Sequence, residues 1–345
     1  MSARAKWIAP ACAAALALLS VPAANVYYHA SGGAGCARCH EISFDYDEWR
    51  HSSHRGVNCV DCHATSLATN LRRVAAHFAG RVPEQVHLAA ADVDRMLPRC
   101  RGCHRQEFAA WASAGHSATY AALFTDRKHN GRQLLIDDCL RCHGMHFDGG
   151  IADLVEPLDT AGPWRLRDAA YAARSAIPCL ACHSVHRQGA PLSRPPERVG
   201  ARQEIVRPSL GLYDRRTRLP VGASLLPLPA VFEGARPVRM SPDPRQSLCY
   251  QCHAPLAAMQ AGSGDDRTPR GVHEGLSCLA CHRSHSQSTR QSCADCHPRL
   301  SNCGLDVEKM DTTFRDPRSG HDVHTVQCLD CHPRGVPKKT PRALH

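Results

Sequence analysis

The sequence predicts a mainly α-helical chain with extensive irregular loops and little or no β-sheet. Three observations predict this class. The pentapeptide Cys-X-X-Cys-His occurs nine times in 345 residues. Aromatic residues are only 5% of the chain, fewer than a side-chain core normally needs at this length. Proline recurs through residues 191–244 and disfavours regular structure there. We therefore expect the chain to fold around apolar groups other than its own side chains.

The repeated pentapeptide is the attachment signature of covalent c-type haem. Two cysteines three residues apart can each bond one vinyl group of the same porphyrin, and the adjacent histidine then becomes the proximal iron ligand. Zinc sites would not explain why His follows every cysteine pair, and chance composition would supply only about 0.08 such motifs. The sequence therefore predicts nine haem c groups and a fold organised around a covalent haem stack.

The predicted attachment residues follow directly from the nine motifs. The thioether cysteines are Cys36, Cys39, Cys59, Cys62, Cys100, Cys103, Cys139, Cys142, Cys179, Cys182, Cys249, Cys252, Cys278, Cys281, Cys293, Cys296, Cys328 and Cys331. The proximal ligands are His40, His63, His104, His143, His183, His253, His282, His297 and His332. Cys12 and Cys303 remain outside the motifs, and we interpret Cys303 as an inert residue.

Fourteen further histidines can supply the sixth iron ligand, and nine bis-histidine irons need only nine. A six-coordinate iron has no vacant position for a substrate, so it is expected to transfer electrons. Seven distal ligands are predicted. Spacing relative to the motifs predicts His54, His146, His186, His273, His285 and His324, and His116 is predicted because it ends a Trp-Ala-Ser-Ala-Gly-His run. A second group of weaker candidates comprises His51, His77, His87, His129 and His321. Methionine ligation is a secondary alternative.

The motif spacing predicts four regions. Residues 1–24 form a signal peptide or an N-terminal anchor, because Arg4 and Lys6 precede an apolar run and a small-residue site. We expect cleavage after Ala23; the alternative is an uncleaved anchor over residues 7–24. A pentahaem region (25–190), a Pro/Arg-rich haem-free connector (191–246) and a tetrahaem region (247–345) follow. Either N-terminal interpretation predicts export to the periplasm or cell envelope.

Two helices are predicted between the motifs. Residues 70–79 place Leu71, Val74 and Phe78 on one face before Gly80. Residues 106–124 form the second, with a break expected at Gly115. The aromatic residues of this segment are expected to pack on porphyrin edges.

The net charge does not predict nucleic acid binding. The chain carries +10, but a ferric haem with two ionised propionates adds about −1, so nine haems bring the oxidised protein close to neutrality. We expect arginine and lysine to pair with propionates instead.

Two segments resemble known cytochromes. Cys-Ala-Arg-Cys-His at 36–40, Tyr46, Trp49, His54 and the Gly-Val-Asn-Cys-Val-Asp-Cys-His run that follows resemble the start of NapC/NirT-type quinol-oxidising cytochromes. The run from Cys100 to His116 resembles the cytochrome family that includes the electron acceptor of hydroxylamine oxidoreductase. The resemblance implies periplasmic electron transfer in respiration, although the unconvincing anchor departs from the quinol-oxidising pattern.

The sequence therefore predicts an electron carrier that relays electrons between redox protein partners. Candidate partners are a membrane quinol dehydrogenase and an outer-membrane porin–cytochrome complex. Two alternatives stay open. One is a reductase of a small nitrogen or sulfur oxyanion with one open haem, although no Cys-X-X-Cys-Lys motif occurs. The other is a conduit or filament cytochrome for extracellular electron transfer.

Overall fold

The computed structural model describes residues 3–63, 66–82, 88–186, 192–193, 205–206, 209–253, 266–286, 289, 322–331 and 333–335. Within these ranges the helices are mostly short and the connections irregular, and strands occur only as two-stranded antiparallel pairs. The predicted mainly α class with little sheet is confirmed. The chain forms two compact units: unit 1 is Met1–Cys103 with Ser184–Ala190, and unit 2 is His104–His183 with Pro191–His345.

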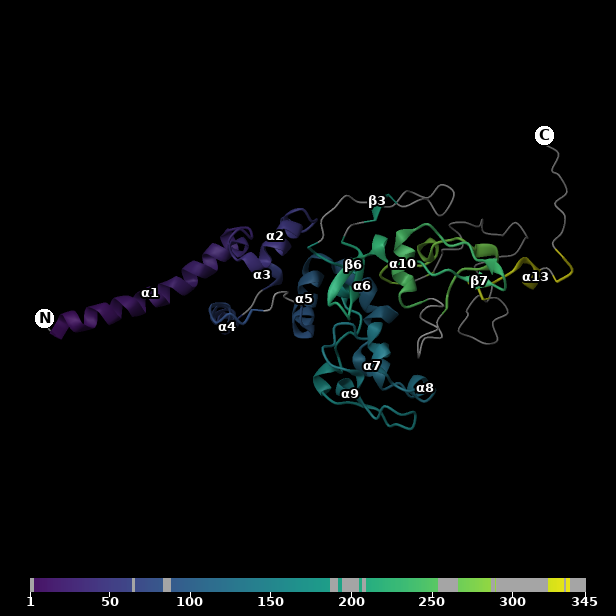
Figure 1. Cartoon of the computed structure of the whole chain (residues 1–345), viewed down its shortest axis with the longest axis horizontal. Coiled ribbons are helices and arrows are strands. Elements are labelled where there is room, and N and C mark those ends of the chain that lie inside the picture. Colours follow the sequence, from purple (N-terminus) through teal and green to yellow (C-terminus); the bar gives the residue numbers. More distant parts are fainter. Residues whose placement is uncertain are drawn as a thin grey trace, which may run out of the picture. The chain divides into compact units, whose positions relative to one another are not determined.

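Unit 1 begins with the long helix α1, Ala3–Ala30, drawn in purple in Figure 1. Its segment Pro10–Ala30 has a mean hydropathy of 1.5 and is long and apolar enough to cross a membrane, a property that signal sequences share. The other helical elements of this unit are η1 Cys36–Arg38, η2 His40–Ile42, α2 Ser43–Arg50, α3 Cys59–Cys62, α4 Leu67–Phe78 and α5 Ala90–Cys103.

Helix α4 confirms the prediction for residues 70–79. Ser66 caps its first turn, because the Ser66 hydroxyl accepts a hydrogen bond from the Thr69 N–H at 3.2 Å. The helix ends where Gly80 takes a φ of +63°, which glycine tolerates best. Its apolar side chains are exposed: Leu71 by 60%, Val74 by 53% and Phe78 by 84%.

Unit 2 contains many short helical elements. They are α6 Arg105–Ala112, η3 Gly115–Ser117, α7 Tyr120–Phe124, α8 Arg127–Asn130, η4 Asp137–Arg141, α9 Ile151–Leu154, η5 Ala169–Tyr171, η6 Cys179–Ala181, η7 Ala223–Leu225, α10 Pro244–Tyr250, η8 Gly271–His273, η9 Cys278–Ala280 and α13 Cys328–Cys331. The predicted helix over 106–124 is therefore broken near Gly115, as expected.

A side-chain core lies in unit 2 between residues 120 and 176. Tyr120 and Phe124 pack with Leu140, Leu154 and other apolar residues. Tyr120 is 3% exposed and Phe124 is 2% exposed. Side chains this deeply buried among protein atoms have little surface left for a porphyrin, so the prediction that these two aromatics pack on porphyrin edges is wrong.

The strands pair as hairpins, mostly in the proline-rich segment. The pairs are β1 Val155–Glu156 with β2 Arg165–Leu166, β3 Leu192–Ser193 with β4 Ile205–Val206, β5 Gly211–Asp214 with β6 Leu219–Gly222, and β7 Phe232–Glu233 with β8 Arg236–Pro237. The segment was expected to lack regular structure. Two-stranded pairs tolerate proline because each strand has an open edge, as at Pro220 opposite Tyr213.

Candidate functional site

One helical turn builds five of the described attachment motifs in the same way. In five motifs the histidine N–H donates to the carbonyl of the first cysteine at 2.8 to 3.0 Å, as in His63 to Cys59 and His183 to Cys179. Residues separated by three and four positions lie on the same side of such a turn. Both cysteines and the histidine can therefore contact the same porphyrin.

Five pairs of imidazole rings face each other, and each pair joins one motif histidine to one histidine outside the motifs. The ring centroids are separated by 5.8 to 6.2 Å. The pairs are His40 with His77, His63 with His186, His253 with His116, His183 with His285, and His282 with His324.

This separation fits two axial ligands on one iron. A bond from a metal to an imidazole nitrogen is about 2 Å long, so two rings on opposite sides of one iron have centroids about 6 Å apart. Other ring pairs reach the same separation, as Tyr120 and Phe124 do at 6.1 Å. What distinguishes the five pairs is that each joins a motif histidine to a second histidine. The residues of the five pairs therefore fit a bis-histidine haem iron.

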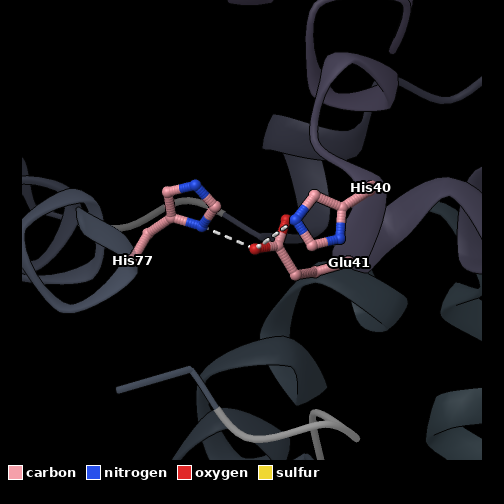
Figure 2. Close-up of side chains that lie close together, drawn as sticks. All are labelled: His40, Glu41 and His77. Carbon is pink, nitrogen blue, oxygen red and sulfur yellow. Dashed lines mark ion pairs between the residues drawn. The ribbon is translucent and has the colours of Figure 1, made fainter. Parts of the chain in front are cut away.

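Figure 2 shows the pair in unit 1 that contains His40 and His77, with the Glu41 carboxylate between the two rings. One Glu41 oxygen lies 3.3 Å from His40 Nε2 and 2.5 Å from His77 Nδ1. A hydrogen bond from its own backbone N–H and then one from His77 lower the pKa of Glu41. An iron held by both rings would take the place of that carboxylate oxygen.

Two of the facing histidines outside the motifs are oriented by aspartates. His324 Nδ1 lies 3.1 Å from Asp322 Oδ1, and His186 Nδ1 lies 3.5 Å from Asp45 Oδ1. A carboxylate at Nδ1 fixes the ring and leaves Nε2 available to a metal. Burial also lowers the pKa of His116 to about 4, which keeps this imidazole neutral and able to bind a metal.

The other predicted distal ligands have different surroundings. His146 is 5% exposed and stacks on Tyr213. His273 Nδ1 lies 3.0 Å from the Val323 carbonyl oxygen. His54 is half-buried, and its backbone N–H donates to the Ser52 hydroxyl. Among the predicted proximal ligands, His104 lies exposed before α6.

The facing pairs therefore include four of the seven predicted distal ligands and one member of the second group. His186, His285 and His324 follow the predicted spacing pattern, and His116 ends the run that predicted it. His77, a weaker candidate from the sequence, is placed beside His40 by helix α4. Several predicted residues lie outside the described ranges: Cys293, Cys296, His297, His332, Cys303, His87 and His321.

Thiols from different motifs also lie together. Hydrogen bonds join Cys36 to Cys59 in unit 1. In unit 2 they join Cys142 to Cys252 and Cys249 to Cys278. The attachment points of different predicted haems are therefore close neighbours in space, and one of the three pairs joins motifs four and six, which are not consecutive.

Comparison with known proteins gives two family matches on separate parts of the chain. Residues 99–184 match the family described as cytochrome c554 and c-prime, and residues 234–298 match the family described as cytochrome c3. No curated protein and no solved structure matches the chain. The matched segments contain motifs three to five and six to eight, and they support a multihaem electron-transfer cytochrome with covalently bound haem c.

Proposed function

We propose that this chain is a nonahaem c-type cytochrome that relays electrons through mostly bis-histidine irons in the periplasm or cell envelope. The five facing imidazole pairs carry this proposal. When bound, each haem supplies an iron that alternates between the ferric and ferrous states and so holds or releases one electron.

The ligands that the protein supplies to each iron determine whether that iron transfers electrons or binds a substrate. A histidine on each side of the iron closes both axial positions, so a small molecule finds no place to bind. His77 and His324 come from segments remote in sequence from the motif histidines that they face. If the two rings of a pair bind one iron, the folded backbone would hold both of its histidine ligands in place.

The N-terminal segment supports export. Helix α1 precedes the first motif directly and contains the apolar segment Pro10–Ala30. With the NapC/NirT-like residues that follow it, this segment suits a protein that takes electrons from a membrane quinol dehydrogenase. The acceptor in this proposal is a second redox protein, such as an outer-membrane porin–cytochrome complex.

A series of alanine variants tests the proposal. In the fully haem-loaded protein, His77→Ala, His116→Ala, His186→Ala, His285→Ala and His324→Ala should each convert one iron to the high-spin state. Added imidazole should restore the low-spin signal. The matched control is His29→Ala, because His29 lies exposed on α1 and is not among the predicted iron ligands.

Electron paramagnetic resonance measures the spin state of the irons in each variant. A reductive titration of the unmodified protein should show nine electrons taken up per chain. Unchanged low-spin spectra in the five facing variants would contradict the ligand assignment. A high-spin iron in the unmodified protein that binds nitrite or hydroxylamine would favour the reductase instead.

A further inference from the structure

Motif six, Cys249–His253, is contacted by motif four. The Arg141 Nη1 group donates to the Gln251 carbonyl oxygen at 2.6 Å, and Cys142 Sγ lies 4.0 Å from the same oxygen. The Cys142 thiol is also hydrogen-bonded to the Cys252 thiol. Motif four is 110 residues away in sequence from the residue it contacts. The fold therefore joins two motifs that are not consecutive.

A buried carboxylate connects motifs six and seven through hydrogen bonds. Asp243 is fully buried and caps α10 by accepting from the Arg245 N–H at 3.0 Å. The Ser277 hydroxyl, which caps η9, donates to Asp243 Oδ2 at 2.7 Å. One carboxylate thus ties together the starts of the two short helices that carry these motifs. The Cys249 and Cys278 thiols are hydrogen-bonded in the same region.

Motif five is tied to motif six through the connector. The Gly211 N–H donates to the Cys182 carbonyl at 2.9 Å, and the Ala223 N–H donates to the Leu210 carbonyl at 3.0 Å. The Ser247 hydroxyl of α10 then donates to the Ala223 carbonyl at 2.9 Å. The Cys182 thiol also interacts electrostatically with the Cys249 thiol.

We propose that the haem of motif six is a branch point of the relay, exchanging electrons with the haems of motifs four, five and seven. This inference rests on the proposed electron-transfer function. Each exchange oxidises one iron and reduces another, and the donor and acceptor proteins supply and remove the electron. A relay that followed the order of the motifs would connect motif six to motifs five and seven only. Coupling to motif four is therefore the distinguishing property.

The variant His116→Met tests the branch point, because His116 faces His253 of motif six. Methionine ligation raises a haem potential, so this haem should become reduced before the others. Nuclear magnetic resonance of the haem methyl groups during a redox titration follows each haem separately. The first electron should shift the signals of three further haems, including the haem attached at Cys139 and Cys142. The matched control Leu225→Met places a methionine at an exposed position of the same unit and should shift none.

The outcomes separate the two proposals. A single His/Met haem whose reduction perturbs only the haems of motifs five and seven would overturn the branch point and leave the relay intact. Exclusively bis-nitrogen ligation in His116→Met would overturn the ligand assignment and the branch point together. If His116→Met incorporates haem poorly, His116→Gly is the second variant, and added imidazole should replace the missing ligand. When carbon monoxide is added in place of imidazole, it should hold that iron in the ferrous state. The nuclear magnetic resonance signals of the same three haems should then shift.

Discussion

The two units carry the same attachment pentapeptide but support it differently. Both apolar clusters of the described residues lie in unit 2, where Tyr120, Leu140 and Leu154 are nearly inaccessible to solvent. In unit 1 the apolar face of α4 is exposed, and the pair formed by His40 and His77 is exposed with it. Unit 2 has a protein core beside its predicted haem sites, whereas in unit 1 the exposed apolar face of α4 would gain apolar contacts from an attached haem.

The largest expected effect lies in the core of unit 2. Leu154→Ala should lower the free energy of unfolding by about 2–5 kcal/mol, because it removes buried methyl groups and leaves a cavity. Denaturant unfolding of the haem-loaded protein measures the change. Leu225→Ala is the control, since Leu225 is 72% exposed and its replacement should stay within about 0.5 kcal/mol. Equal losses in both variants would contradict the assigned core.

Gly271→Ala should have the next largest effect, about 1–3 kcal/mol. Gly271 has a φ of +60°, and an added Cβ would meet the Val326 carbonyl oxygen of the segment that carries His324. Displacing this segment should also produce a high-spin iron at motif seven. Gly234→Ala is a matched control with the same φ of +60° and no atom within 4 Å of the added Cβ. Similar haem spectra in both variants would argue against this placement of His324.

Phe78→Ala measures the contribution of haem in unit 1. Although Phe78 is 84% exposed, it adjoins His77, so an attached haem should cover it. The loss should then exceed about 1 kcal/mol in the haem-loaded protein. Phe232→Ala, in the haem-free connector and 57% exposed, should cost less. If Phe78→Ala costs no more than this control, unit 1 does not gain its apolar contacts from haem.

The smallest expected effect compares one helix cap in each unit. Ser66 caps α4 and Thr119 caps α7 through the same type of hydrogen bond, so either alanine variant should cost about 1 kcal/mol. Only Ser66→Ala should increase the high-spin fraction on warming, because α4 carries His77. Temperature-dependent visible spectra distinguish the two variants. The reverse result would show that α4 does not hold a haem ligand.

Local patterns predicted much of this structure. The motif turns, α4 and the break near Gly115 follow from spacing, capping and glycine, which act within a few residues. The β5 and β6 hairpin was missed because its prolines suggested irregular chain, and its pairing depends on contacts outside the segment.

The sequence did not predict which distal histidine faces which motif histidine. The +3 spacing identified both His186 and His285, and each faces a motif histidine. The same spacing also selected His146, which instead stacks on Tyr213 in the described structure. Which ring faces which motif depends on tertiary packing, so sequence spacing selects candidates without assigning partners.

The most direct test of the electron-relay account is quantitative electron paramagnetic resonance of the oxidised, fully haem-loaded protein, combined with near-infrared magnetic circular dichroism. The account predicts low-spin irons with two nitrogen ligands at every described pair, and no substrate-accessible iron. A stoichiometric high-spin iron that binds a nitrogen or sulfur oxyanion would contradict the relay and identify a catalytic haem.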